Sequence, residues 1–399
     1  MGGLAEAVHD LLGAVLATRA KRTWLVTGTG DTVGMVDGFH RSPVAYVWPT
    51  SLALGAGGKR SIYLDLNHWI GLAKAFVGHK DGGRYLGLLE AARLAVERGQ
   101  VIFPLAGQHY MEMSGIRSPR QREDIARVMM ELSQFRTLLC RSLVMRLELE
   151  AVLDARVGRR AIPYVTLDLI GTGFGHAFGV NGQLQIRDAL GSAPEAIRRD
   201  WPGGAEEHDR WLAKAQDMGE WMMLRGPQDE DLEDLAANGF DPAAARRGQE
   251  IRAQQEREQA ERFDEDPRWR RGRIRDVVGA RYLIVELMDM LNEGLEARAA
   301  SLDDLFSHDH DAVRAVVDGM PGGDVHVSLQ VAAHRNPQSS WTPNDYFDID
   351  ALSLAVPYCD VVVTERRRAR DLEWSGCPER LGTILLTSPE DLLGELDRS

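Results

Sequence analysis

The sequence predicts an α/β fold in three layers, with helices on both faces of a parallel sheet, interrupted by a large and mostly helical insertion. Three observations predict it. In residues 59–118, short apolar runs of strand length are each followed by a helical pattern. The same unit returns in residues 341–399, and strand, helix and parallel strand form the βαβ unit. Residues 119–340 carry mainly helical spacing.

The composition limits the class of protein. The chain has 399 residues, 44% hydrophobic and 27% charged, as in a globular protein. A net charge of -13 argues against a protein that coats nucleic acid by charge alone. Cys140, Cys359 and Cys377 lack C-x-x-C spacing, which argues against a zinc site or a disulfide framework. Because no apolar run reaches the ~18 residues that span a bilayer and no signal peptide is recognisable, we expect a cytoplasmic protein.

Residues 1–58 are predicted to form an N-terminal helix and a β-like segment. Apolar residues recur at helical spacing from Leu4 to Leu16, and β-like runs lie between Arg22 and Pro49. The stretch G-T-G-D-T-V-G, Gly28 to Gly34, does not open a helix. We therefore interpret it as a hairpin turn, with a nucleotide-using enzyme as the alternative.

The first strand of the core is predicted at Ser61–Leu64, within S-I-Y-L-D-L-N-H-W. Asp65 ends this strand, and a helix follows from His68 to Val77. Open α/β sheets place their chemistry at the carboxyl ends of strands, and Asp is also a favoured helix cap. Asp65 is therefore predicted to be a metal ligand that can cap the helix as well.

A second strand is predicted at Val101–Leu105, after a helix over Tyr85–Arg98. The next helix resumes near Gly107 and carries Glu112 in its first turns. Because both acids follow strands of one parallel sheet, Glu112 should lie beside Asp65.

The insertion, residues 119–340, carries three stretches of note. G-T-G-F-G-H-A-F-G, Gly171 to Gly179, is interpreted as an insertion loop, with a lid over a substrate site as the alternative. The run Arg247 to Arg275 mixes both charges, as solvated helix faces do. His308-Asp309-His310-Asp311 resembles a metal cluster only in composition.

The final segment, residues 341–399, returns to the core. Thr342-Pro343-Asn344-Asp345 is a helix-start signature, and the helix also carries Asp348 and Asp350. Val361–Thr364 is a buried strand with Glu365 at its carboxyl end. Asp360 precedes that strand, so we expect it at the opposite edge of the sheet in a structural role.

Acidic residues from four positions in the chain are thus expected at one edge of the predicted sheet. Carboxylates gathered there repel one another unless a divalent cation neutralises them. Oxygen ligands without Cys or His favour Mg²⁺ or Mn²⁺ over zinc, and such a site suits phosphodiester hydrolysis. The predicted ligands are Asp65, Glu112, Asp348 and Glu365, with Asp345 as a rival or additional ligand. The sequence does not decide whether Asp350 or Asp360 replaces one of these ligands.

The segments D-L-N-H-W, H-Y-M-E-M and N-D-Y-F-D-I-D-A-L-S-L-A-V-P-Y-C-D-V-V-V-T-E resemble the PIN-like nuclease superfamily. The resemblance covers residues 59–118 and 340–399, and the insertion departs from the family, whose typical members are far smaller. It implies a compact α/β/α fold and a metal-dependent ribonuclease, toxin-like or RNA-processing. It also matches Asp65, Glu112, Asp348 and Glu365 to the acids of the family.

Basic and aromatic residues near these motifs suggest contacts with a substrate. Arginine is suited to phosphate, and two clusters flank the acids. Solvated helix surface is the alternative for both clusters. His68 and His109 are candidate proton donors, and Trp69 is expected in the core, with base stacking as the alternative. The predicted phosphate contacts are Arg117, Arg120, Arg366 and Arg367, in clusters that also contain Arg122, Arg368 and Arg370.

The leading hypothesis is a Mg²⁺- or Mn²⁺-dependent endoribonuclease that cleaves single-stranded RNA. Its catalytic residues would be the four acids, which hold the metal and activate water. One alternative is a degenerate PIN-like interaction protein without catalysis, and another is a nuclease for single-stranded DNA. The insertion is a candidate surface for a protein partner or inhibitor. The sequence leaves open whether the protein forms a homo-oligomer, and no membrane association is expected.

Overall fold

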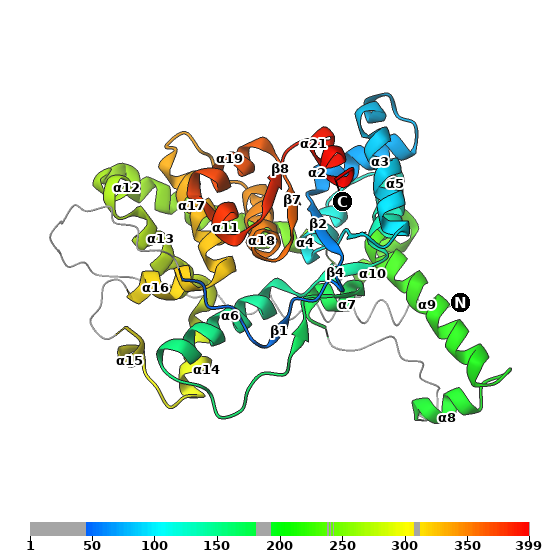
Figure 1. The fold of residues 1–399 in the computed structure, drawn as a ribbon, viewed down its shortest axis with the longest axis horizontal. Coiled ribbons are helices and arrows are strands. Elements are labelled where there is room, and N and C mark those ends of the chain that lie inside the picture. Colours follow the sequence, from blue (N-terminus) through cyan, green and yellow to red (C-terminus); the bar gives the residue numbers. More distant parts are fainter. Residues whose placement is uncertain are drawn as a thin grey trace.

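The computed structural model describes residues 45–180, 193–237, 239, 241, 243–306 and 312–398. The fold is mixed α/β and mostly helical, with small parallel sheets (Figure 1). Three sequence predictions lie outside the described residues: the helix from Leu4 to Leu16, the β-like stretch up to residue 44 with its Gly28–Gly34 turn, and the His308–Asp311 cluster. Within the described ranges, no helix is long and apolar enough to cross a membrane.

The predicted parallel sheet is present. It has four strands in the order β3-β2-β7-β8, all parallel to their neighbours. Elsewhere, β1 pairs with β5 in parallel and β4 pairs with β6 antiparallel. The strands are β1 (Leu52–Ala53), β2 (Arg60–Leu64), β3 (Val101–Ile102), β4 (Arg136–Leu138), β5 (Leu167–Asp168), β6 (Ile170–Thr172), β7 (Val361–Val363) and β8 (Ile384–Leu386).

The direction in which the sheet grows reverses between its two central strands. From β2 the chain crosses to β3 on one side, and from β7 it crosses to β8 on the other. Leu64, at the end of β2, is in register with Val363, at the end of β7. Open α/β sheets bind ligands outside the carboxyl ends of strands at such a reversal. Asp65 and Glu365 follow these two strand ends closely.

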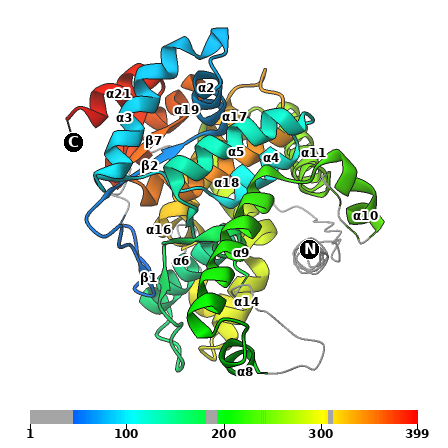
Figure 2. The ribbon, with the colours of Figure 1, turned by 90° about the vertical axis from the view of Figure 1, so that its right-hand side faces the viewer.

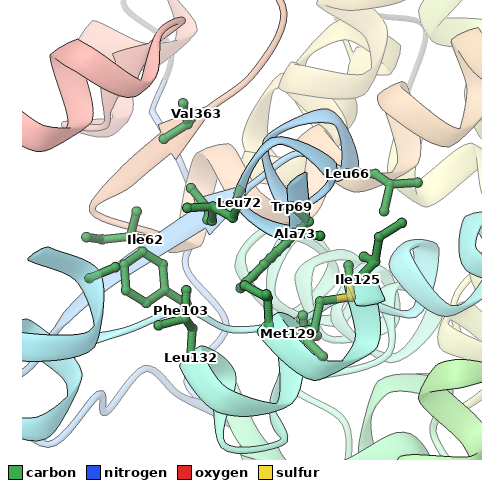
Figure 3. Close-up of a cluster of buried hydrophobic side chains, with 14 of the residues drawn as sticks. Ile62, Leu66, Trp69, Leu72, Ala73, Phe103, Ile125, Met129, Leu132 and Val363 are labelled. Atoms are coloured by element: carbon green, nitrogen blue, oxygen red, sulfur yellow. The ribbon is translucent and has the colours of Figure 1, made fainter. Parts of the chain in front are cut away.

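Side chains of β2 alternate between two hydrophobic cores because successive residues of a strand point to opposite faces. Ile62 and Leu64 join a core with α2 (Leu66–Phe76), α3 (Leu86–Glu97) and α5 (Pro119–Ser133). Figure 3 shows part of this core, in which Ile62, Trp69 and Phe103 lie together. Trp69 is fully buried, which confirms the expectation that it belongs to the core.

Tyr63 faces the second core, with Val362 from β7 and Ile349 and Leu352 from α18 (Pro343–Tyr358). Helices therefore cover both faces of the sheet. α21 (Pro389–Leu396) packs beside α3 (Figure 2). The remaining core helices are η1 (Lys80–Tyr85), α4 (Gly107–Ser114), α19 (Arg366–Ser375) and α20 (Cys377–Leu381).

Local sequence explains where the last helices begin. α18 starts with a reciprocal capping box: Oγ1 of Thr342 accepts from the backbone N–H of Asp345, and the carboxylate of Asp345 accepts from the backbone N–H of Thr342. Pro343 occupies the first turn, where its missing N–H costs nothing. Ser388 caps α21 in a similar way. The predicted helix start at residues 342–345 is confirmed.

The insertion is mostly helical, as predicted, and has a hydrophobic core of its own that includes Leu149, Phe263 and Leu291. Besides α5, its helices are α6 (Arg141–Arg156), α7 (Gly173–Phe178), α8 (Pro194–Arg199), α9 (Ala205–Arg225), η2 (Asp229–Asp231), α10 (Leu232–Ala237), α11 (Ala244–Glu265), α12 (Arg268–Gly272), α13 (Ile274–Tyr282), the π-helical η3 (Leu283–Leu287), α14 (Met288–Glu296), α15 (Leu302–Phe306), α16 (Ala312–Gly319) and α17 (Pro321–Arg335).

The insertion also pairs with the chain just beyond β3. The backbone N–H of Leu105 donates to the carbonyl of Arg136, and the N–H of Leu138 donates to the carbonyl of Leu105. The interpretation of Gly171–Gly179 as an insertion loop is wrong, because these residues form the end of β6 and the helix α7. Phe174 and Phe178 of α7 stack at 4.4 Å and contact Tyr110 of α4, so the segment is held by aromatic packing.

Candidate active site

Asp65 lies at the carboxyl end of β2 and caps α2. Its Oδ1 accepts a hydrogen bond from the backbone N–H of Asn67 (3.4 Å), and its Oδ2 accepts one from Oγ1 of Thr364 (3.3 Å). Thr364 directly follows β7, so both central strands contribute to this point. Because a carboxylate offers several lone pairs, capping the helix leaves Asp65 able to accept further contacts.

Glu365 is the residue before α19, and its side chain is exposed. Oε1 of Glu365 accepts a hydrogen bond of 2.5 Å from Nδ2 of Asn67. The sequence did not single out Asn67, although its place two residues after Asp65 was visible in the D-L-N motif. This bond holds the carboxylate of Glu365 near the start of α2.

Glu112 and Asp348 come from the helices α4 and α18. Both are half-buried. Oδ2 of Asp348 accepts a hydrogen bond of 2.9 Å from Nε of Arg368. No residue within the described ranges makes a hydrogen bond with the carboxylate of Glu112, which leaves its oxygens available to a ligand.

The charges of these acids act on one another. Burial, and after it the charges of Asp348 and Glu365, raise the pKa of Asp65 to about 7. Burial raises the pKa of Glu112 well above its ordinary value, and the charges of Asp65, Asp348 and Glu365 raise it further. Like charges shift a pKa only when they are near. Asp348 and Glu365 therefore lie within electrostatic reach of Asp65 and Glu112, and Asp65 and Glu365 follow the carboxyl ends of the two central strands.

The four acids do not form a complete metal-binding site in the positions that they occupy. Across the part of the chain that the structure describes, no three Asp, Glu, His or Cys side chains stand close enough to hold a metal ion as they are placed. The donor chemistry nevertheless fits Mg²⁺ or Mn²⁺, since the ligands are carboxylates alone. Burial and neighbouring negative charges raise the pKa values of Asp65 and Glu112, whereas Asp348 has Arg368 as a positive partner.

Arg368 is a buried arginine, not a surface contact for phosphate. Its side chain is 2% exposed, and its Nη2 donates to Oδ1 of Asp345 (2.5 Å) while its Nε bonds Asp348. Its Nη1 has no hydrogen-bond partner among the described residues. The sequence grouped it with its neighbours, but Arg368 shares the inward face of α19 with Ala369 and Leu372.

Both carboxylate oxygens of Asp345, the predicted rival or additional metal ligand, already have partners in the structure. Oδ2 of Asp345 accepts hydrogen bonds from the backbone N–H (2.8 Å) and Oγ1 (2.7 Å) of Thr342. Its Oδ1 pairs with Arg368. Both oxygens thus hold the start of α18 and orient Arg368, so the residue supports Asp348 instead of competing with it.

Asp350 and Asp360 also have structural partners. Asp350 is buried and pairs with Arg252 (2.6 Å) and Arg141 (3.3 Å), both from the insertion. Asp360 accepts from the backbone N–H (2.7 Å) and Oγ (2.8 Å) of Ser61, at the start of β2. It therefore lies at the opposite edge of the sheet, as expected, and neither acid replaces one of the four.

The two candidate proton donors are buried histidines. Nδ1 of His109 accepts from the backbone N–H of Ala106 (2.9 Å), so Nε2 donates to the carbonyl of Leu64 (2.8 Å). Burial lowers the pKa of His109 and of His68 to about 4. His109 is neutral at pH 7 and fixes α4 against the end of β2. Neither histidine carries the additional proton of the imidazolium form near pH 7, so the structure does not support a role for them as proton donors.

All four predicted phosphate contacts are on the surface. The side chains of Arg117, Arg120, Arg366 and Arg367 are exposed. Arg367 donates a hydrogen bond to Oγ of Ser339 (3.0 Å). Arg122 is different: it is buried and donates to the carbonyls of Ile116 (2.6 Å) and Arg225 (3.0 Å), so it fastens α9 to α5.

Tyr63 is a neighbour of the acids that the sequence presented only as part of an apolar strand. It is buried and stacks on His109, with 5.1 Å between ring centroids. Burial raises the pKa of Tyr63, and the charges of Asp65, Glu112 and Asp348 raise it further. The alternation of β2 was the available signal, because it turns Tyr63 away from Ile62 and Leu64.

Comparison with models of known families, with curated proteins and with solved structures finds no match to this chain.

Proposed function

We propose that this protein is a nuclease that depends on a divalent metal and hydrolyses phosphodiester bonds in RNA. One observation carries the proposal: Asp65 and Glu365 follow the two central strands where the sheet reverses, and Glu112 and Asp348 lie near enough for the charges of these acids to act on Asp65 or Glu112. The resemblance of the same segments to the PIN-like superfamily supports it and suggests RNA as the substrate.

Four carboxylates would hold the cation, and they are Asp65, Glu112, Asp348 and Glu365. When bound, Mg²⁺ or Mn²⁺ would lower the pKa of a coordinated water and stabilise negative charge on the phosphate. The chain itself positions the acids. Thr364 orients Asp65, Asn67 orients Glu365, and Arg368 orients Asp348. Arg366 and Arg367, exposed beside Glu365, are suited to bind phosphates of the substrate.

The test compares cleavage of a labelled single-stranded RNA in Mg²⁺ or Mn²⁺ by the wild-type, Asp65→Asn and Glu112→Gln proteins. We expect each variant to lose about a hundredfold or more in rate, the scale on which one charge-stabilising group matters. Glu379→Gln removes an exposed acid from α20 and should cleave normally. Cleavage by Asp65→Asn at the wild-type rate would overturn the proposal.

A second candidate is an interaction protein that keeps this core without catalysis. The observation in its favour is that the acids, as placed, do not form a cage. Titration calorimetry with Mn²⁺ separates the two, because a catalytic site should give binding heat that Glu112→Gln abolishes. RNA and DNA strands of the same sequence, assayed side by side, decide between the two substrates.

A further inference from the structure

One face of α19 carries three arginines and a tryptophan. Arg366, Arg367, Arg370 and Trp374 are exposed, while Ala369 and Leu372 on the other side are buried. At about 100° per residue, the four exposed side chains fall within about 100° of the helix circumference. Trp374 is 48% exposed, a large apolar surface for a residue of this type.

Arg335, at the end of α17, extends this surface. Its guanidinium lies over the ring of Trp374, 4.3 Å from the ring centroid. We name Arg335, Arg366, Arg367, Arg370 and Trp374 the basic–aromatic face. It is a local concentration of positive charge in a chain whose net charge is -13.

Asp371 and Glu373 lie at the borders of this face. Arg368, Arg367 and Arg370 act against the burial that raises the pKa of Asp371. Glu373 is exposed on the opposite border. The arginines therefore outnumber the acids on α19, and Arg370 lies one helical turn before Trp374.

We propose that a single-stranded segment of the RNA substrate, next to the cleavage point, binds along the basic–aromatic face with one base stacked on Trp374. This inference rests on the proposed function, because α19 begins directly after Glu365, one of the four acids. At 1.5 Å per residue, Trp374 stands about 13 Å along the helix from Glu365.

The combination of residues selects this class of ligand. Arginines bind the phosphate backbone, and a base stacks on an exposed aromatic ring regardless of its identity. A duplex would engage the arginines but keeps its bases stacked inside, so it gains nothing from Trp374. An acidic protein surface would likewise interact with the arginines and gain little from the ring of Trp374.

The test measures binding of a labelled oligouridine of about 12 nucleotides to the full chain by fluorescence anisotropy, in EDTA so that no cleavage occurs. Trp374→Ala should weaken binding about tenfold, within the range of one base–aromatic stack. The double variant R366Q/R370Q should lower the slope of log affinity against log salt by about 1.4, or about 0.7 for each lost phosphate contact.

Matched controls lie on the insertion. Trp269→Ala removes a tryptophan of similar exposure, 43%, from α12. R246Q/R262Q removes two exposed arginines from α11. Both controls should bind the oligouridine as the wild type does, and all variants should keep the wild-type melting temperature because the replaced side chains are exposed.

The outcomes separate this inference from the proposed function. Unchanged affinity and salt slope in the α19 variants would overturn the inference even where cleavage still needs Asp65. Binding that needs Trp374, in a wild type that cleaves no RNA, would overturn the function alone. If Trp374→Ala weakened a duplex as much as the single strand, or affected only a polyglutamate probe, the ligand would not be a single strand and the inference would fail.

Discussion

Nδ2 of Asn67 lies 2.5 Å from Oε1 of Glu365 and donates a hydrogen bond to it. The two residues are 298 positions apart in the chain. Asn67 belongs to the first turn of α2 and Glu365 directly precedes α19, so the bond joins the helices that leave the two central strands. It holds an exposed carboxylate beside Asp65, where the sheet reverses.

Replacing Asn67 by Ala should slow RNA cleavage about tenfold, because the carboxylate of Glu365 loses its fixed orientation and misplacement of a reacting group is costly. The melting temperature should hardly change, since Asn67 is exposed. Asn344→Ala, an exposed asparagine in the first turn of α18, is the matched control. Equal rates for Asn67→Ala and this control would contradict the positioning role.

The stability of the metal-free protein should fall as the pH rises toward 7. The pKa of Asp65 is raised from its ordinary value of 3.8 to about 7, so between these values the folded state binds more protons than the unfolded state. This contribution to stability is fully present below pH 3.8 and is lost as the pH rises through about 7.

Urea unfolding in EDTA at pH 5 and at pH 8 measures this effect. Asp65→Asn should reduce the difference between the two free energies of unfolding by on the order of 2 kcal/mol, after a discount for the partial exposure of Asp65. Burial also raises the pKa of Glu148 to about 7, so part of the slope should persist in the variant. An identical slope in both proteins would show that Asp65 ionises normally.

Arg368→Met should destabilise the fold by about 3–5 kcal/mol, because it leaves the carboxylates of Asp345 and Asp348 without their partner. Arg368→Lys should recover part of the loss, since lysine keeps the charge but not the forked geometry. Chemical denaturation measures both. Arg370→Met, on the exposed face of the same helix, should cost less than about 1 kcal/mol. If Arg368→Met lowered the free energy of unfolding as little as Arg370→Met, the pairing of Arg368 with Asp345 and Asp348 would not stabilise the fold.

The contact between the insertion and the core should depend on Arg252 and Asp350. Arg252 pairs with Asp350 of α18 at 2.6 Å and with Glu286 of η3 at 2.7 Å. Removing either Arg252 or Asp350 should cost about 3–5 kcal/mol. The double variant R252M/D350L should lose less than the sum of the single losses, because the remaining Arg141 and Glu286, 3.8 Å apart, still pair with each other. Additive losses in this double-mutant cycle would show that the two residues act independently.

Local features of the sequence predicted much of the core. The apolar runs at residues 61–64 and 361–363 form neighbouring central strands, and the signature at Thr342 starts a helix. These features depend on contacts between residues close in the chain, such as a side chain that caps its own helix. The expectation that Asp65, Glu112 and Glu365 share one edge followed from the same reasoning, because parallel strands share one carboxyl edge, whereas Asp348 lies on the helix that precedes β7.

The sequence by itself determined the central strands of the four-stranded sheet and the acids that follow them. It could not separate Arg366 and Arg367 from Arg368, or Asp348 from Asp345, because neighbours of one residue type differ only in what packs against them. Tertiary structure decided this: α18 and α19 meet with Arg368 between them, and its guanidinium pairs with both acids. Burying that charge requires partners. These partners belong to α18, and the helical period of the sequence does not predict where α18 lies relative to α19.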